Sequence, residues 1–337
     1  MSKNPDIKVA PKSVVVGVDD GYAMTKVVII EGGKVTTELM IPSRARSGIH
    51  GTTVIGDSDE SGPFTGYETD GVRFTVGDMA DAESARFNEY PFSGMNRVIV
   101  NHALRLAGLA GVNVRIATGL PLSTFYKGEG PNSELIARKD ASIRTPVKSA
   151  DDSVMPNIVE HSVFPEGLAA WVDYAIGEEG EIRVDLSETV GVIDIGGRTT
   201  DVAVVLPGKR IDHARCGSAD IGVLNVVEAV RVSLLKSKNV EVPTSTIEQA
   251  LRARSLKMWG KVVDIGEDID AAVAQVMDSV MREVNRRLGS AVDVDRILLV
   301  GGGAHLFREV AKSYPNVVVP PAPEFANARG FAKYLSL

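Results

Sequence analysis

Two stretches of the sequence repeat each other at a constant offset of 175 positions, and this duplication constrains the fold more than any other feature. Residues 18–27 lie over residues 193–202 without a gap, and the match extends to Gly33-Lys34 over Gly208-Lys209. Each copy reads as strand, glycine-containing turn, strand, turn, strand. Because the offset is close to half of the 337 residues, it suggests two similar halves around a shared cleft.

The first turn of each copy has the composition of a phosphate-binding turn. Asp19 and Asp194 end apolar strands, and Gly21 and Gly196 follow two residues later. Glycine lets backbone N–H groups approach an anion closely. Two aspartates can also hold a hydrated Mg²⁺, which keeps several waters and takes few direct protein ligands. The repeats therefore predict a cleft for a phosphate-bearing ligand and its metal.

The two copies differ at one charged position, where Lys26 in the first copy corresponds to Asp201 in the second. Lysine supplies a compact positive charge for a phosphate, so the two turns need not do equal work. A single copy would favour the simpler interpretation, an ordinary hairpin with an Asx-type turn. The duplication at constant offset favours the phosphate-binding interpretation instead.

Composition excludes several classes of protein. With 44% hydrophobic and 24% charged residues, the chain is predicted to be soluble and globular, with about two domains. Its net charge of −7 argues against direct, broad binding to nucleic acid. Cys216 is the only cysteine, which excludes internal disulfides and thiolate zinc sites. The polar segment 1–13 lacks a signal-peptide core, and no run is long enough to span a membrane, so we expect a cytoplasmic protein.

Apolar periodicity predicts strands with helices between them, an α/β architecture whose sheets are mixed because each half contains an antiparallel meander. In the first half we expect strands at 14–18, 26–30, 34–41, 73–76 and 113–118, and helices at 96–109 and 167–176. In the second half we expect a meander at 189–215, helices at 221–235, 246–255 and 268–288, a strand at 296–300 and a helix from near His305. Residues 44–70 are predicted to be a loop or an insertion, residues 127–153 a polar surface excursion with a strand or two, and residues 177–181 a linker between the halves.

Two further segments are candidates for the same site. The run Gly301-Gly302-Gly303-Ala304 follows an apolar strand and precedes a predicted helix, where a nucleotide can meet the backbone, although such turns also arise for tight packing. Its glycine spacing excludes a Rossmann fingerprint. Glu166 follows Pro165 at a predicted helix start, with Pro165 in the first turn. Glu166 could orient or deprotonate water. Alternatively, it could simply be an acidic residue that the helix dipole stabilises.

Taken together, these residues resemble the superfamily of actin, sugar kinases and seventy-kilodalton chaperone ATPases. Five motifs carry the resemblance in chain order: Asp19-Asp20-Gly21 through Lys26, Pro165-Glu166-Gly167-Leu168-Ala169-Ala170, Asp194-Ile195-Gly196-Gly197-Arg198-Thr199-Thr200-Asp201, Gly301-Gly302-Gly303-Ala304 and Asn327-Ala328-Arg329-Gly330-Phe331. Within the superfamily the chain is most similar to the plasmid-segregation actins called ParM or StbA and to archaeal actin-like proteins. Three more segments support this narrower likeness: residues 118–122, 164–166 and 217–222.

The resemblance implies an actin-like, duplicated ribonuclease-H-like fold: two α/β domains with mixed sheets, flanked by helices, around a nucleotide cleft. Domain I is expected at residues 1–182, completed by a C-terminal helix at 321–337. Domain II is expected at 183–320, with a smaller inserted subdomain near 225–290.

The resemblance also implies roles for individual residues toward ATP or ADP and Mg²⁺. Asp19 and Asp194 would organise the waters of Mg²⁺, Lys26 would reach the β-phosphate, and Glu166 would position the attacking water. Other contacts with the nucleotide are expected from Asp20, Gly21, Tyr22, Ala23, Gly196, Gly197, Arg198, Thr199, Gly222, Gly301, Gly302, Gly303 and Ala304. Tyr22, Ala23 and Arg198 depart from the residues common in this family, and Arg198 could contact phosphate or point to solvent.

The function implied is that of an ATPase that polymerises on binding ATP and disassembles after hydrolysis. It would segregate plasmid DNA through a centromere-binding adaptor protein. The other expected partner is a further copy of the chain itself, and no membrane partner is expected. The alternative is a small-molecule kinase of the sugar-kinase type, for which residues 127–153 offer no evident acceptor site. A chaperone-type ATPase would need a substrate domain that 337 residues do not accommodate.

Overall fold

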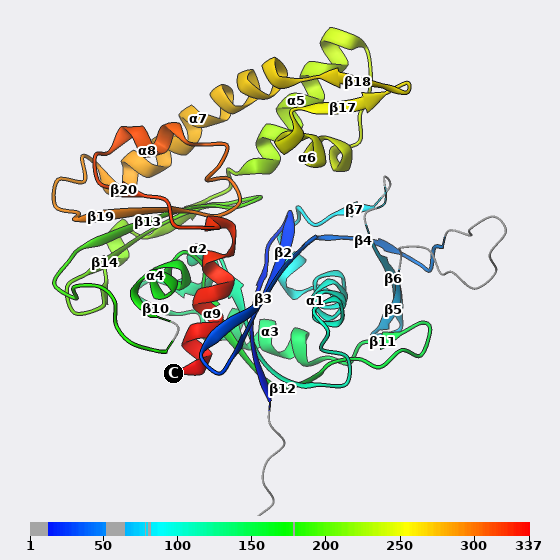
Figure 1. Cartoon of the computed structure of the whole chain (residues 1–337), viewed down its shortest axis with the longest axis horizontal. Coiled ribbons are helices and arrows are strands. Elements are labelled where there is room, and N and C mark those ends of the chain that lie inside the picture. Colours follow the sequence, from blue (N-terminus) through cyan, green and yellow to red (C-terminus); the bar gives the residue numbers. More distant parts are fainter. Residues whose placement is uncertain (1–12, 52–64, 78, 80–81, 178) are drawn as a thin grey trace, which may run out of the picture.

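The computed structural model describes residues 13–51, 65–77, 79, 82–177 and 179–337. Two mixed sheets form the centres of two neighbouring α/β units, each flanked by helices (Figure 1). The predicted fold class is therefore confirmed. The lead-in expected at 1–13 lies outside the described residues except for Ser13.

The first sheet contains the first copy of the repeated segment. Its strands are, in spatial order, β12 (Asn157–Pro165), β8 (Asn113–Leu120), β1 (Val14–Asp20), β2 (Met24–Glu31) and β3 (Lys34–Pro42). β12, β8 and β1 run parallel, whereas β1, β2 and β3 form the expected antiparallel meander.

The second sheet repeats this arrangement. Its strands are β15 (Arg210–Ile211), β14 (Thr200–Leu206), β13 (Val190–Ile195), β19 (Arg296–Val300) and β20 (Val317–Val318), with β16 (Gly217–Ala219) also paired to β14. β13 pairs with β14 as β1 pairs with β2: Asp194 lies opposite Asp201 in one hairpin, and Asp19 opposite Lys26 in the other. Residues 175 positions apart in the sequence thus occupy the same positions in the two hairpins.

Helices cover the two faces of the first sheet. α1 (Gly94–Leu106) packs against the face of β1 and β2 that presents Val16 and Val27, and α3 (Ser133–Arg144) packs beside β12. α4 (Leu168–Ala175) and α9 (Ala326–Ser336) pack on the other face, where Val28 lies against Ala328.

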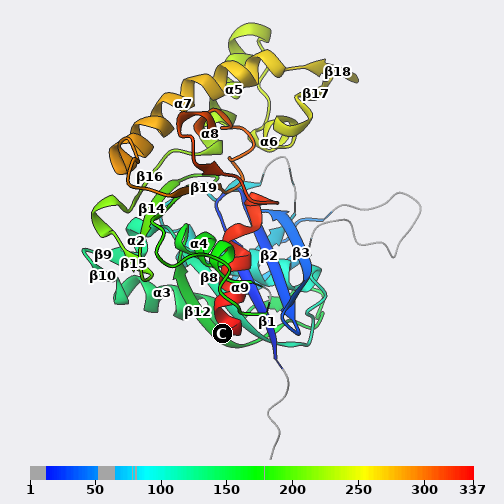
Figure 2. The same ribbon diagram turned by 60° about the vertical axis from the view of Figure 1, so that its left-hand side comes forward.

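The contact of α9 with β1 requires a glycine. A Cβ on Gly17 would lie 1.9 Å from the carbonyl oxygen of Ala328, so the helix backbone rests directly on the strand. The C-terminal helix therefore belongs structurally to the first sheet, as Figure 2 also shows. The domain bounds expected from the sequence stay a prediction.

Two segments contain more regular structure than expected. A small antiparallel sheet consists of β11 (Lys148–Ser149), β5 (Thr65–Thr69), β6 (Val72–Val76), β4 (Arg44–Ser47) and β7 (Glu83–Ser84). The loop prediction for 44–70 was therefore wrong at β4 and β5, while 52–64 lies outside the described residues. The strand or two expected in 127–153 are present as short strands, β11 among them, but the prediction missed helix α3. Helix α3 buries Lys139, Ser142 and Ile143, a largely polar set that gives no apolar period.

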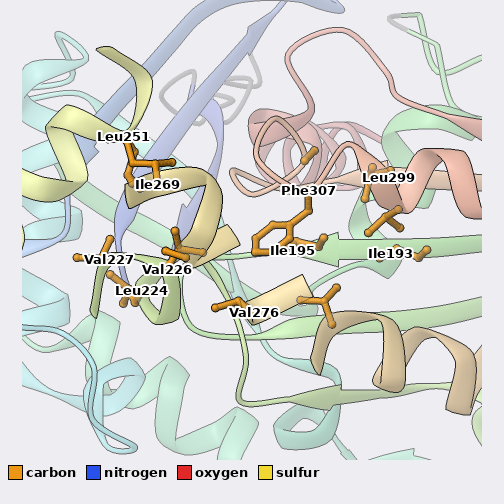
Figure 3. Close-up of a cluster of buried hydrophobic side chains, with 14 of the residues drawn as sticks. Ile193, Ile195, Leu224, Val226, Val227, Leu251, Ile269, Val276, Leu299 and Phe307 are labelled. Carbon is orange, nitrogen blue, oxygen red and sulfur yellow. The ribbon is translucent and has the colours of Figure 1, made fainter. Parts of the chain in front are cut away.

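Three helices and one hairpin lie above the second sheet (Figure 1), between β16 and β19 in the chain, and we call this segment the insertion. It comprises α5 (Val223–Lys238), α6 (Thr244–Ala253), the hairpin β17 (Ser255–Met258) and β18 (Lys261–Asp264), and the long helix α7 (Gly266–Leu288). The three helices were predicted. Their apolar faces meet the second sheet in one core, where Leu224, Ile269 and Val276 lie near Ile193 and Ile195 (Figure 3).

Two helix starts differ from those predicted. α8 (Glu309–Ser313) begins after His305, which lies in a series of turns that the preceding glycines favour. Pro165 ends β12 and is not in the first turn of α4, because Gly167 has a positive φ of 74° between strand and helix. Other short elements are α2 (Leu122–Phe125), β9 (Tyr126–Lys127), β10 (Gly130–Pro131) and three 3₁₀ turns at Tyr90–Phe92, His213–Arg215 and Pro323–Phe325. Among the described residues, no helix has the length and apolar character needed to cross a membrane.

Candidate functional site

A cavity of about 760 Å³ lies between the two units, and both repeats contribute to its wall. The residues expected at a nucleotide site that line it are Asp19, Gly21, Tyr22, Ala23, Lys26, Glu166, Asp194, Gly196, Gly197, Arg198, Thr199, Gly301 and Gly302. Four expected residues are not in this lining: Asp20, Gly222, Gly303 and Ala304. The structure therefore brings together segments that lie far apart along the chain.

In the first turn, a lysine and an aspartate form a buried ion pair. Lys26 Nζ donates to Asp19 Oδ2 at 2.8 Å, across the β1–β2 hairpin. Burial disfavours the charge on Lys26, but the neighbouring Asp19 carboxylate outweighs it and raises the pKa of the lysine. Lys26 is thus a fixed positive charge at the cavity wall.

Asp20 faces away from the cavity. Its carboxylate accepts hydrogen bonds from Asn96 Nδ2 at 2.7 Å and from Lys139 Nζ, and Lys139 is completely buried. Successive side chains of a strand point to opposite faces, so Asp19 and Asp20 cannot both enter the cleft. Sequence reasoning missed Asn96 and Lys139, since neither their type nor their spacing links them to Asp20. They hold the end of β1 in place from behind.

The second turn places Asp194 against an asparagine of the C-terminal helix. Asn327 Nδ2 donates to Asp194 Oδ2 at 2.6 Å, and the amide oxygen of Asn327 accepts the backbone N–H of Gly167 at 3.0 Å. Burial and the nearby carboxylates of Asp201 and Asp19 raise the pKa of Asp194 to about 7. One asparagine side chain therefore joins the second turn to the start of α4.

Asp201, the counterpart of Lys26, is used differently. It is buried and accepts hydrogen bonds from the backbone N–H of Leu122, at 2.9 Å, and from the hydroxyl of Ser218. Leu122 comes just after strand β8 of the first sheet. Asp201 therefore links the second hairpin to the first unit. Burial raises the pKa of Asp201 despite these bonds.

Glu166 lies at the cavity wall between β12 and α4. Its backbone N–H donates to Leu120 at 2.9 Å, and a Cβ on Gly119 would lie 2.8 Å from its Oε1. Burial, followed by the charges of Asp19 and Asp201, raises the pKa of Glu166 well above its usual value. Such a carboxyl group holds a proton more readily than an ordinary glutamate does.

Arg198 contacts residues of both units. Its guanidinium carbon lies 5.0 Å from the ring centre of Tyr22, which belongs to the opposite turn. Its Nε donates to Asp220 at 2.7 Å and its Nη2 donates to Asn88 at 2.5 Å. Since Tyr22 and Asn88 belong to the first unit, Arg198 bridges the two units beside the cavity.

Two glycines and one alanine, Gly222, Gly303 and Ala304, lie behind the cavity. A Cβ on Gly222 would lie 2.6 Å from the carbonyl oxygen of Gly197, so Gly222 lets the start of α5 support the second turn. Gly303 packs equally closely against Ile195, and Ala304 is buried in the core. These residues shape the turns without lining the cavity.

Gly301, by contrast, has a positive φ of 87°, and a Cβ there would lie 2.3 Å from Asp194 Oδ1. Only glycine fits both the backbone conformation and the space.

The inserted helix α6 supplies a wall that sequence reasoning missed. Ser245, Glu248 and Gln249 line the cavity, and Glu248 forms an ion pair with Arg44 at 2.7 Å. Nothing in the local sequence of α6 marks these residues as part of a site, because they reach it only through the packing of the insertion.

The donor set fits a hydrated magnesium ion. Asp19 and Asp194 both line the cavity together with Glu166 and Asp201, and Lys26 lines it beside Asp19. Burial, together with repulsion between these neighbouring carboxylates, raises the pKa values of Glu166 and Asp194, and a divalent cation would offset the repulsion. No group of three or more metal-ligating side chains is preformed among the residues described. A few carboxylates with waters and substrate phosphates are what Mg²⁺ usually takes.

Comparison with known families identifies this arrangement. A model described as plasmid segregation protein ParM, N-terminal, matches residues 14–175, and a model described as archaeal actin homologue MreB-like, C-terminal, matches residues 192–312. The chain has an actin-like fold. The first match covers the strands of the first sheet, and the second match covers most of the second sheet. Each sheet contains one copy of the repeat.

Full-length relatives agree with this assignment. An archaeal actin homolog from Thermoplasma acidophilum is 27% identical, over 94% of this chain and 97% of the relative. The solved structure of Ta0583, an archaeal actin homolog, in complex with ADP has a TM-score of 0.75 and 24% identity, over 96% of this chain and 99% of that one. A subunit of a 15-stranded ParM filament from Clostridium botulinum has a TM-score of 0.71 and 19% identity, with the same coverage of both chains. These similarities establish the actin-like fold.

Proposed function

We propose that this actin-like protein binds ATP with Mg²⁺ in the cleft, hydrolyses it, assembles into filaments in the ATP state and disassembles after hydrolysis. The observation that carries the proposal is the meeting of the two equivalent hairpin turns at one cavity, with Lys26, Asp19 and Asp194 in its wall. A relative with this fold has been solved with ADP, and another as a filament, which supports both parts of the proposal.

The residues of the cleft would divide the work of phosphoryl transfer, which depends on positioning and charge stabilisation. Asp19 and Asp194 would hold Mg²⁺ through its waters, and the ion would supply positive charge to the phosphates. Lys26 would contact the phosphate chain from the first turn. Glu166 would orient the attacking water and accept its proton. Gly196, Gly197 and Thr199 would present the backbone of the second turn.

The assembled protein would act in the cytoplasm and move plasmid DNA through a centromere-binding adaptor protein. The net charge of −7 supports an indirect link, because direct contact with phosphates needs a local excess of Lys and Arg. Retention of a low-copy plasmid that carries the gene tests this role. Deletion should raise plasmid loss in dividing cells, and loss at the wild-type rate would count against it.

Light scattering of the purified protein tests assembly. Scattering should rise with Mg-ATP at micromolar protein, and stay low with Mg-ADP or without nucleotide. Flat scattering together with sugar-dependent release of ADP would contradict the filament proposal and support a small-molecule kinase.

A further inference from the structure

The β17–β18 hairpin ends in a tryptophan that the described chain leaves uncovered. Trp259 is 81% exposed, and it and Gly260 both have positive φ, 47° and 78°, as in a type I′ turn. Such turns favour Asn-Gly, because a bulky residue is disfavoured at positive φ. Trp259 therefore carries two costs, an exposed aromatic ring and an unfavourable backbone conformation, and it is not part of the hydrophobic core that the described residues of the second unit form.

The tip is both apolar and basic. Val262, 76% exposed, lies opposite Lys257 on the outward face of the hairpin, and Lys261 is exposed beside them. The inward face buries Leu256 and Met258 in the core. We call Lys257, Trp259, Lys261 and Val262 the hairpin tip.

The opposite end of α7 carries a complementary surface. Helix α7 has 23 residues, which at 1.5 Å per residue separates its ends by about 34 Å. The loop after it exposes Val292 by 89%, flanked by the exposed acids Asp293 and Asp295. Asp293 pairs with Arg215, yet 60% of its side chain stays exposed. We call Val292, Asp293 and Asp295 the acidic loop; the hairpin and this loop lie at opposite ends of the second unit (Figures 1 and 2).

We infer that the hairpin tip of one copy docks on the acidic loop of the next copy. The partner is a second copy of this chain, because the same molecule presents an apolar, basic knob at one end and an apolar, acidic surface at the other. Two different surfaces in contact make a head-to-tail interface, which continues into a filament when the rotation does not close a ring. The inference rests on the filament assembly proposed above and names the surface that carries it.

Substitution of Trp259 tests the tip without harming the fold. Trp259→Asn installs the residue that this turn prefers, so the thermal midpoint should not fall. Its critical concentration for assembly with Mg-ATP should rise at least about tenfold, as for a central aromatic contact, while affinity for a fluorescent ATP analogue stays at the wild-type value. Leu106→Asn, which changes an exposed leucine on α1, is the matched control and should assemble normally.

Disulfide cross-linking tests the partner surface. A chain with Trp259→Cys, Val292→Cys and Cys216→Ser should form a ladder of multiples of 35.9 kDa when oxidised with Mg-ATP, and either new cysteine alone should give none beyond dimers.

Each outcome decides a different point. Wild-type levels of assembly by Trp259→Asn, or filaments without a ladder, would overturn this interface and leave the proposed function intact. A wild-type protein that binds ATP and never assembles would overturn the filament proposal, and this inference with it.

Discussion

Gly197 and Ala23, one from each repeat, lie in contact across the cleft. A Cβ built on Gly197 would be 2.6 Å from the Cβ of Ala23 and 3.0 Å from its backbone nitrogen. No real Cβ approaches another atom so closely, so the second turn can reach the first only with glycine at this position. The two phosphate turns that the sequence repeat predicts are thus in contact in the folded chain.

Gly197→Ala should separate the two turns. The added methyl group must push Ala23 away, so we expect affinity for ATP to fall by roughly tenfold, the effect of about 1.4 kcal/mol. Titration calorimetry with Mg-ATP measures this change. Gly130→Ala is the control, because a Cβ there meets nothing within 4 Å and the residue lies outside the cavity lining. Equal affinity in the two variants would mean that contact between the turns does not matter.

Glu166→Gln should separate hydrolysis from binding. The amide keeps the size of the side chain but cannot accept a proton from water. Loss of a general base usually costs about 10²-fold or more in turnover, whereas ATP should bind at least as tightly, because a negative charge has been removed near the phosphates. Phosphate release and nucleotide titration give the two values. Parallel loss of both would assign Glu166 a structural role.

Asp194→Asn should alter how stability depends on pH. The folded pKa of Asp194 is about 7 against an ordinary value of 3.8. The folded state therefore holds a proton at pH 5 that the unfolded state has lost, and this contribution to stability disappears as pH rises through about 7. The Asp194→Asn variant has no group that titrates at this position, so its stability lacks this dependence on pH. Relative to wild type, the variant should gain on the order of 2 kcal/mol between pH 5 and pH 8.

Denaturant unfolding of the nucleotide-free, metal-free proteins at both pH values measures the difference. A constant gap between the two proteins would show that Asp194 is ionised throughout this range.

Lys139→Met should destabilise the fold. It leaves the buried Asp20 carboxylate with Asn96 but without its cation, and breaking a buried ion pair by removing one partner typically costs about 3–5 kcal/mol. Adding Asp20→Asn should restore much of the loss, since the unpaired charge is then gone. Urea unfolding of the single and double variants tests this. If the double variant is no more stable than the single one, the ion pair is not the cause.

The repeat and the hairpins could be predicted from the sequence because their signals are local. Register within a hairpin depends on a short run of residues, so the match of residues 18–27 with 193–202 carried over directly into paired strands. The side of the strand on which Asp20 lies also follows from alternation, once Asp19 is placed in the cleft.

Other parts of the site depend on contacts between distant residues. Asn327 is 133 positions from Asp194, and Lys139 is 119 positions from Asp20. The α6 wall reaches the cavity only through the packing of the insertion. Helix α3 escaped prediction because its buried face includes Lys139 and Ser142 in place of an apolar stripe.

The central claim is that nucleotide in this cleft controls assembly. The most direct measurement records light scattering and phosphate release together after Mg-ATP is added to one sample of the protein. Scattering should rise before phosphate appears, and should fall as ATP is exhausted and ADP accumulates. Phosphate release without any change in scattering, or scattering that does not respond to Mg-ATP, would contradict the account.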